Sequence, residues 1–443
     1  MKSKKMLLVL VFAAIMAAGW LAVVRAVSNT EALEAQKSLT AEAEGYMEKG
    51  LYVRAIPLYE EALTYDSERN DSIQEKLLDA YLAYDDFSAY RKLAEYRISQ
   101  GTASEQEYLN VAEYYMGRSK LKEAMELIQK GIKQTNSEVL AEYFEANRYA
   151  YGIKTTKYEM ILPTNTNSLM PAFNGTKWGY VDAKGKMQLD FIYDSALPFN
   201  SQGVAVVSME GTYYTILQNG DKYGVDDGVE YPKMTDVTAV SGIRILGQRN
   251  GAYSYYDYDF APLAPTHQYS RMTANACGAA AVRKEGRWGI ISNSGQGVLD
   301  FVLEDVAVNS LGCAFAGDRA MVKRDGSWVL VDTSGSPVSD GRYADAKAPE
   351  SEGYIAVADS TGRWGYINSE GELVIDYQYA DAKSFSDGLG AVLTAGSWGY
   401  ISERNEQVIE GMFTDAQPFH NGIAQVEIVG STALITLKYY AAE

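Results

Sequence analysis

Two hydrophobic periods divide most of the chain. From residue 30 to about residue 155, apolar residues recur every three or four positions and glycine is scarce, which predicts α-helices. From residue 156 onward apolar and polar residues alternate, and glycine and tyrosine become frequent, which predicts β-strands joined by tight turns. We therefore expect a multidomain protein, with a helical segment at residues 30–155 and an all-β segment at residues 156–443.

The helical segment repeats itself every 34 or 35 residues. Its equivalent positions form three columns: Ala43, Leu78, Ala112 and Ala146; Tyr52, Phe87 and Leu121; and Ala55, Tyr90 and Ala124. Small residues at helix crossings let paired helices approach, and larger ones fill the groove between them. The run from Ala43 to Leu63 resembles the tetratricopeptide repeat, and a plain array of helical hairpins is the alternative. The second unit departs from the pattern, with Tyr90 and Arg97 where small residues are expected.

This register also selects a candidate peptide-binding groove. In proteins that resemble tetratricopeptide repeats, the first helix of each unit lines the concave surface. The residues that follow the packed column, and those three positions further on, share one face of that helix. They form an acidic row and a flexible apolar row: Glu44, Asp79 and Glu113, with Met47, Leu82 and Met116. Such a groove suits a basic segment with apolar anchors, and a solvated helix face is the alternative.

The all-β segment contains several copies of one short strand. Residues 397–402 read Ser-Trp-Gly-Tyr-Ile-Ser, and near copies or looser ones recur at a regular spacing. Alternation places Trp398 and Tyr400 on one face and Gly399 and Ile401 on the other, so both faces are apolar and must be covered. The bare glycine leaves room for close packing. The predicted structural anchors are Trp178, Trp288, Trp328, Trp364 and Trp398, with Tyr213, Tyr253 and Thr432 continuing the series.

The spacing of turn residues indicates how the β-units are joined. Glycines stand two positions before most of these anchors, and glycine or asparagine stands seven positions after, which predicts tight turns on both sides of each strand. The last unit lacks its second half, and Tyr158–Pro163 resembles the missing part. A unit divided between the two ends would close the domain and remove exposed sheet edges. We expect a propeller-like ring of about eight units, and an open β-solenoid is the alternative.

The segments from Phe385 to Ile401 and their copies resemble the bacterial WG repeat, also called the KWG repeat. The resemblance covers the all-β segment, residues 156–443, and is clearest in the first and the last four tryptophan units. It implies an extracytoplasmic or interaction module with no established chemistry.

The amino-terminal segment, residues 1–29, has a different composition. Leu7–Val24 is a run of 18 apolar or small residues, preceded by three lysines and followed by Arg25. Its length lies between that of a secretory signal and that of a membrane span, which needs about 20 residues. We expect an uncleaved signal anchor and a single-pass cell-membrane protein whose bulk is extracytoplasmic. Cleavage of the leader and secretion is the alternative.

The net charge and the few histidine and cysteine residues argue against several classes of function. The net charge is −18, and −22 without the leader's Lys2, Lys4, Lys5 and Arg25, which argues against a nucleic-acid partner. With His267 and His420 as the whole histidine complement, no metal-ligand spacing or histidine-based nucleophile is evident, and we expect no cofactor and no enzyme. The sequence leaves two alternatives for Cys277 and Cys313, which are a disulfide between them or two free thiols.

An acidic column and a surplus of tyrosine each have two interpretations. Asp305, Asp345, Asp381 and Asp415 recur at one position of the unit; we expect each to bond its own turn backbone, and cation binding is the alternative. Most of the 34 tyrosines recur at strand positions, which predicts packing between units rather than ligand stacking.

Together these features predict a membrane-anchored extracytoplasmic scaffold for protein–protein interactions in the bacterial cell envelope. A module that binds cell-wall polymer or carbohydrate is the first alternative, and an envelope hydrolase is a remote one.

Overall fold

The computed structural model describes residues 31–440 except residues 66, 165, 167, 168, 224–232, 264–268 and 352. Within these residues, no helix has the length and apolar character needed to cross a bilayer. The predicted membrane signal anchor at residues 1–29 lies outside the described residues. By its internal contacts the chain divides into two compact units between Arg148 and Tyr149, earlier than the predicted helical boundary at residue 155.

The first unit consists of paired helices. Between residues 31 and 148, residue 66 apart, the described chain forms seven: 31–47, α2 (Tyr52–Ala62), α3 (Asn70–Ala83), α4 (Phe87–Gln100), α5 (Glu105–Gly117), α6 (Leu121–Thr135) and α7 (Glu138–Arg148). The predicted column Tyr52, Phe87 and Leu121 supplies the first residue of every second helix. Ala43, Leu78 and Ala112 are buried, as expected for a crossing column, whereas Ala146 is exposed. The repeat register read from the sequence is therefore confirmed for three helix pairs.

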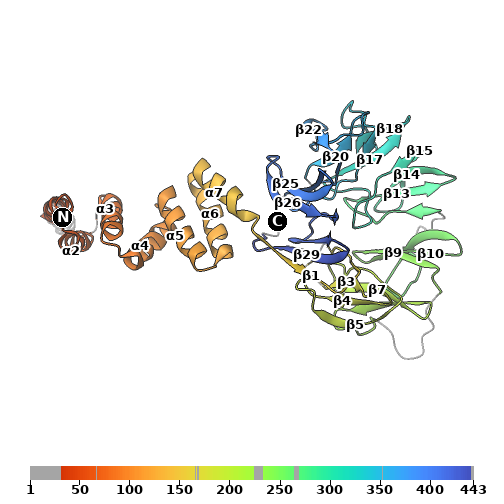
Figure 1. The fold of residues 1–443 in the computed structure, drawn as a ribbon, viewed down its shortest axis with the longest axis horizontal. Helices are drawn as coiled ribbons and strands as arrows, with labels where there is room; N and C mark the ends of the chain where they lie inside the picture. Colours follow the sequence, from red (N-terminus) through yellow and green to blue (C-terminus); the bar gives the residue numbers. More distant parts are fainter. Residues whose placement is uncertain are drawn as a thin grey trace, which may run out of the picture. The chain divides into compact units, whose positions relative to one another are not determined.

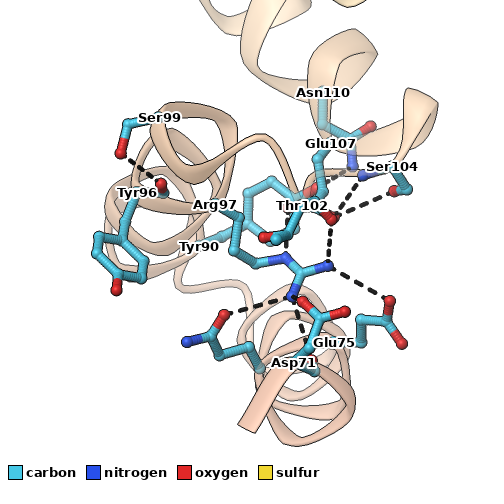
Figure 2. Close-up of polar contacts among 11 residues, drawn as sticks. Asp71, Glu75, Tyr90, Tyr96, Arg97, Ser99, Thr102, Ser104, Glu107 and Asn110 are labelled. Carbon is cyan, nitrogen blue, oxygen red and sulfur yellow. Dashed lines mark hydrogen bonds and ion pairs between the residues drawn. The ribbon is translucent and has the colours of Figure 1, made fainter. Parts of the chain in front are cut away.

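A buried arginine explains why the second unit departs from the pattern. Arg97 on α4 is fully buried, and Figure 2 shows its guanidinium between the carboxylates of Asp71, Glu75 and Glu107. Its Nε donates to Glu107 Oε2 at 2.9 Å, and its terminal nitrogens pair with Asp71 and with Glu75, the latter at 3.3 Å. Glu107 also accepts the amide of Ser104 at 2.9 Å and so caps α5. An ion cluster here replaces small-residue packing and joins α3, α4 and α5.

The second unit is a ring of eight small antiparallel sheets, here called blades 1 to 8 (Figure 1). Blades 1 to 4 comprise β2 (Met160–Ile161), β3 (Met170–Phe173), β4 (Trp178–Val181) and β5 (Met187–Tyr193); β6 (Ser195–Ala196), β7 (Val204–Met209) and β8 (Thr212–Leu217); β9 (Asp236–Ser241), β10 (Arg244–Arg249) and β11 (Ala252–Tyr256); and β12 (Arg271–Met272), β13 (Ala279–Lys284), β14 (Arg287–Ser292) and β15 (Gly297–Leu303). Blades 5 to 7 comprise β16 (Asp305–Val306), β17 (Arg319–Arg324) and β18 (Ser327–Asp332); β19 (Asp345–Ala346), β20 (Ile355–Ala358), β21 (Trp364–Ile367) and β22 (Leu373–Tyr379); and β23 (Asp381–Ala382), β24 (Leu389–Thr394), β25 (Ser397–Ser402) and β26 (Gln407–Phe413). Blade 8 comprises β27 (Asp415–Ala416), β28 (Ile423–Ile428), β29 (Ser431–Leu437) and β1 (Tyr151–Thr155).

The predicted anchor positions, Thr432 included, all lie on the third strand of a blade. In six blades of the described chain, the hairpin before that strand turns on two consecutive residues with positive φ, as at Ala395 and Gly396 (φ 52° and 87°). Such two-residue turns match the right-handed twist of the flanking strands. A Cβ on Gly399 would lie 2.6 Å from the carbonyl oxygen of Ile409, because the fourth strand bulges over this position. The glycine of the repeated Trp-Gly pair is therefore needed for close approach of two backbones.

The ring closes by pairing the two ends of the domain, which confirms the propeller and excludes the open solenoid. Strand β1 runs antiparallel to β29, with Ile153 opposite Ile435, and completes blade 8. The segment predicted to do this was Tyr158–Pro163, and that prediction was wrong. Met160 and Ile161 in it pair instead with β3 as the first strand of blade 1. The segment Tyr158–Pro163 does resemble parts of other units, but those parts are the first strands of blades. The strand that closes the ring, β1, lies just before it in the sequence.

Candidate binding sites

The six predicted groove residues lie on the first helix of each helical pair. Glu44 and Met47 lie on helix 31–47, Asp79 and Leu82 on α3, and Glu113 and Met116 on α5. Their exposure fits a surface role: Asp79, Leu82 and Glu113 are exposed, and Glu44, Met47 and Met116 are half-buried. We call these six residues the acidic face.

The carboxylates of the acidic face act on tyrosines of other helices. Burial, and then the charges of Glu44 and Asp79, raise the pKa of Tyr59 on α2 to about 12. Burial and Glu113 raise the pKa of Tyr143 on α7 in the same way. Glu44 and Asp79 therefore act on one side chain, whereas Glu113 acts on a side chain of α7.

Lys76 modifies the predicted acidic row. Its ammonium group pairs with Glu44, with both side chains well exposed to solvent. The sequence pattern missed this pair because Lys76 lies on α3, and only helix packing brings it to Glu44. An exposed pair of this kind is weak and is screened by salt, so it can exchange for a ligand.

The five predicted tryptophan anchors have a packing role. Trp288, Trp328, Trp364 and Trp398 are 6–9% exposed, and Trp178 is half-buried. Lysines of the same blade cover two indole rings, with Lys347 Nζ 4.4 Å from the Trp364 centroid and Lys383 Nζ 5.2 Å from that of Trp398. The rings are thus enclosed and do not form a row open to a ligand.

Three of the four aspartates of the acidic column bond to backbone, as expected, and the fourth contacts a lysine side chain. Asp305, Asp345 and Asp381 each accept the amide of the next residue at 2.8–2.9 Å, and Asp415 pairs with Lys383 at 3.1 Å. No group of three or more metal-ligating side chains occurs among the described residues.

Cys277 and Cys313 are free thiols, and burial, with Cys277 and Glu350 nearby, raises the pKa of Cys313 to about 12.

A belt of hydrogen bonds joins the loops that follow the first strands of successive blades. Each neighbouring pair of blades has at least one such bond: Thr166 to Phe199, Asn200 to Gly242, Ser241 to Asn275, Ala274 to Gly312, Asn309 to Pro349, Ser351 to Phe385, Gly422 to Asp387, and Asn421 to Thr164. The last of these bonds crosses the seam between blade 8 and blade 1. In it, Asn421 Nδ2 donates to the backbone carbonyl oxygen of Thr164 at 2.6 Å. The belt fixes the loops at one end of the ring.

Three of these loops converge on a polar cluster that the sequence analysis missed. Ser310 of blade 5 lies 2.6 Å from both Glu350 Oε2 of blade 6 and His420 Nε2 of blade 8. Glu350 also accepts the Ser310 amide at 3.1 Å, and its Oε2 lies 3.5 Å from His420 Nε2. The one signal in the sequence was that His420 replaces the Ser386 of an otherwise repeated Phe-x-x-Gly loop. His267 lies outside the described residues.

This cluster borders a cavity of about 290 Å³ at the seam between blades 1 and 8. Blade 1 contributes Met160, Ile161 and Met170 to its wall, and blade 8 contributes Ile423 and Leu434. The polar groups on the wall include Ser310, Gln417, His420 and Gln425. A mostly apolar wall with a few polar groups is typical of small-molecule sites.

The sequence model of the family described as WG containing repeat matches residues 178–213, 364–396 and 398–430. The chain thus contains this repeat in three places, which include the anchors Trp178, Trp364 and Trp398. No curated protein matches the chain.

Solved structures similar to parts of the chain include helical and propeller proteins. The first TPR of Spaghetti (RPAP3) bound to an HSP90 peptide is 16% identical, covers 26% of this chain and 92% of its own, and has a TM-score of 0.21. Hsv2 of Kluyveromyces lactis is 11% identical over 62% of this chain and 93% of its own, with a TM-score of 0.36. An inactive virginiamycin B lyase from Staphylococcus aureus with quinupristin is 10% identical over 65% of this chain and 100% of its own, with a TM-score of 0.31. At these values the fold assignment rests on the strand pairing described above.

Proposed function

We propose that this protein is a scaffold that binds other proteins, and that the acidic face of its helical unit recognises a lysine- or arginine-rich segment with apolar anchors. The observation that carries the proposal is the placement of Glu44, Asp79 and Glu113 on the first helices of successive pairs, beside Met47, Leu82 and Met116. Carboxylates steer a basic partner, and flexible thioether and leucine side chains adapt to its apolar residues.

The test uses the full chain and a peptide in which lysines alternate with leucines. Fluorescence anisotropy should give saturable binding that weakens as salt rises, because exposed charges are screened beyond about 10 Å at 0.1 M salt. The variant Glu44→Lys/Asp79→Lys/Glu113→Lys should weaken binding at least tenfold and flatten its salt dependence. The same peptide with glutamate in place of lysine should not bind.

A matched control separates this face from net charge. Glu61, Glu123 and Glu126 are exposed carboxylates on the second helices α2 and α6. Reversing these three changes the total charge equally and should leave affinity within about twofold. Equal losses from both triple variants would reject the acidic face, provided that circular dichroism shows unchanged helicity.

We also propose that the protein is held in the cell membrane by residues 1–29, with the scaffold on the extracytoplasmic side of a bacterial envelope. The support is the apolar run Leu7–Val24 with its flanking basic residues, together with the repeat resemblance. Amino-terminal sequencing of membrane-extracted protein tests this, and a mature start at Val27 would contradict a retained anchor.

Binding rather than catalysis fits the polar cluster of the propeller. In a Ser-His-acid triad, the acid contacts the imidazole nitrogen that the serine does not use. Here Ser310 and Glu350 both approach Nε2 of His420. Binding of wall polymer through tyrosines has less support, because Tyr180, Tyr366 and Tyr400 at strand positions are fully buried.

A further inference from the structure

We propose that the seam cavity between blades 1 and 8 binds a neutral, mostly apolar small molecule that donates one hydrogen bond to Ser310. This site is separate from the acidic face and goes beyond the scaffold function. Its volume of about 290 Å³ lies just below the usual range for small-molecule sites, about 300–1,000 Å³. A compact ligand therefore fits better than a long chain.

The hydrogen bonds that Ser310 makes within the cluster leave one lone pair of its hydroxyl oxygen as an acceptor for the ligand. The Ser310 hydroxyl lies 2.6 Å from Glu350 Oε2, a carboxylate oxygen that can only accept, so its hydrogen points there. His420 Nε2, also 2.6 Å from Ser310 Oγ, must then carry the hydrogen and donate. A hydroxyl oxygen has two lone pairs. The second lone pair of Ser310, on the cavity wall, can accept from a ligand N–H or O–H group.

Two other polar side chains of the wall each make a hydrogen bond within the protein. Gln425 Oε1 accepts the amide of Ile161 at 2.6 Å, and Gln417 Nε2 donates to Asp415 at 2.5 Å. These two bonds hold the side-chain amides in place across the seam and within blade 8. We assign the ligand's hydrogen bond to Ser310, because this side chain lies on the wall and its two partners leave one acceptor position on the hydroxyl oxygen.

The charges around the cavity favour a neutral ligand. His420 is the titratable side chain on its wall, and it faces Glu350, whose side chain is 9% exposed. A buried carboxylate repels an anion placed beside it. Its two oxygens already accept the Ser310 amide and hydroxyl and lie beside His420, so a cation would have to displace these donors.

A pair of fluorescent probes tests both the site and its charge preference. N-phenyl-1-naphthylamine is neutral, apolar and carries one N–H donor; 8-anilinonaphthalene-1-sulfonate has the same arylamine with an added sulfonate. We expect saturable, one-to-one binding of the neutral probe to the full chain and at least tenfold weaker binding of the sulfonate. No saturable signal with the neutral probe, or equal affinity for both, would overturn the proposal.

Variants place the probe within the protein. Ile423→Trp fills the cavity and should abolish binding, whereas Ile243→Trp adds the same bulk at a residue of blade 3 that is 68% exposed and should not change it. Leu434→Phe is a second filling variant, and circular dichroism confirms folding of each. Ser310→Ala should lower the affinity for the N–H probe severalfold while leaving that of a naphthalene lacking a donor unchanged. Binding retained by both filling variants would locate the probe elsewhere, and an unchanged affinity in Ser310→Ala would reject the hydrogen-bond assignment.

Discussion

A buried tyrosine links each well-matched repeat to the next blade. Tyr180, Tyr366 and Tyr400 each stand two positions after a tryptophan anchor and donate to a carbonyl 17 residues further on, at 2.8, 3.1 and 2.7 Å. Each ring also packs against a phenylalanine of that next blade, with centroids 4.8 Å apart. Burial raises the pKa of all three hydroxyls well above the ordinary value, so they stay protonated donors. The expectation that strand tyrosines pack between units is confirmed at these positions.

Tyr400→Phe isolates the contribution of the hydroxyl. The change keeps the ring but leaves the partly buried carbonyl oxygen of Gln417 without this donor, so we expect a loss of about 1–3 kcal/mol. Chemical denaturation followed by tryptophan fluorescence measures it. Tyr223→Phe, at a tyrosine 37% exposed in the same domain, should cost less than about 0.5 kcal/mol. Equal effects of the two changes would reject a special role for the inter-blade bond.

Trp398→Ala tests whether the anchors act by packing. The indole is 7% exposed and lies in a cluster with Tyr400, Phe413 and Ala424, so its removal leaves a cavity in addition to the lost transfer energy. We expect destabilisation by about 3–5 kcal/mol in urea denaturation. A change below about 1 kcal/mol would mean that the indole is exposed in solution, and would restore ligand stacking as an interpretation.

At the scale of elements, one ion cluster holds three helices together. Arg97 of α4 is surrounded by Asp71 and Glu75 of α3 and by Glu107 of α5. Asp71 and Glu75 are more than half exposed, but the Glu107 side chain is 5% exposed. The cost of breaking the cluster therefore falls mainly on Glu107, which would remain charged and buried.

Arg97→Met should destabilise the helical unit by about 3–5 kcal/mol, because it removes the partner of a buried carboxylate. Arg91→Met on the same helix breaks a more exposed pair with Glu95 and should cost less than about 1 kcal/mol. Thermal unfolding followed by circular dichroism compares them. Adding Glu107→Gln to Arg97→Met should recover part of the loss, since glutamine keeps the cap of α5 without the charge. No recovery would point to lost packing as the main cause.

At the scale of the whole molecule, ring closure depends on a strand from outside the tryptophan repeats. β1 pairs with β29 over five residues and covers an edge that would otherwise be open. The belt of loop bonds and the cluster of Tyr158, Ile161, Met170 and Leu434 seal the same seam. The proposed ligand cavity lies at this seam, so the site exists only in the closed ring.

The double change Ile153→Pro/Lys154→Pro tests the closure. Successive residues of an antiparallel strand alternate in facing the partner, so one of the two prolines removes a ladder donor. We expect the propeller to lose at least about 2 kcal/mol, and the uncovered edge of β29 to promote oligomers in size-exclusion chromatography. Gly152→Ala, where an added Cβ meets no atom within 4 Å, is the control and should behave as the unmodified protein.

The repeating parts of this protein could be predicted from local patterns along the chain. Hydrophobic period, turn glycines and tryptophan spacing located the helix pairs and the third strand of every blade, because each depends on short-range backbone geometry. The incomplete last unit also indicated that the ring closes, but not which strand closes it. The sequence placed Glu44, Asp79 and Glu113 on one set of helices, but not Lys76, whose contact requires the packing of α3 on its neighbour.

Contacts between units that are distant in the chain could not be predicted in this way and follow from the folded ring. The closing strand was Tyr151–Thr155 rather than Tyr158–Pro163, because pairing with β29 is a long-range choice that local likeness does not specify. The contact of Ser310 with His420 joins residues 110 positions apart across the ring. Repeat columns show what each unit shares, whereas this cluster and its cavity are built from positions where the units differ, and their convergence follows from the curvature of the closed ring.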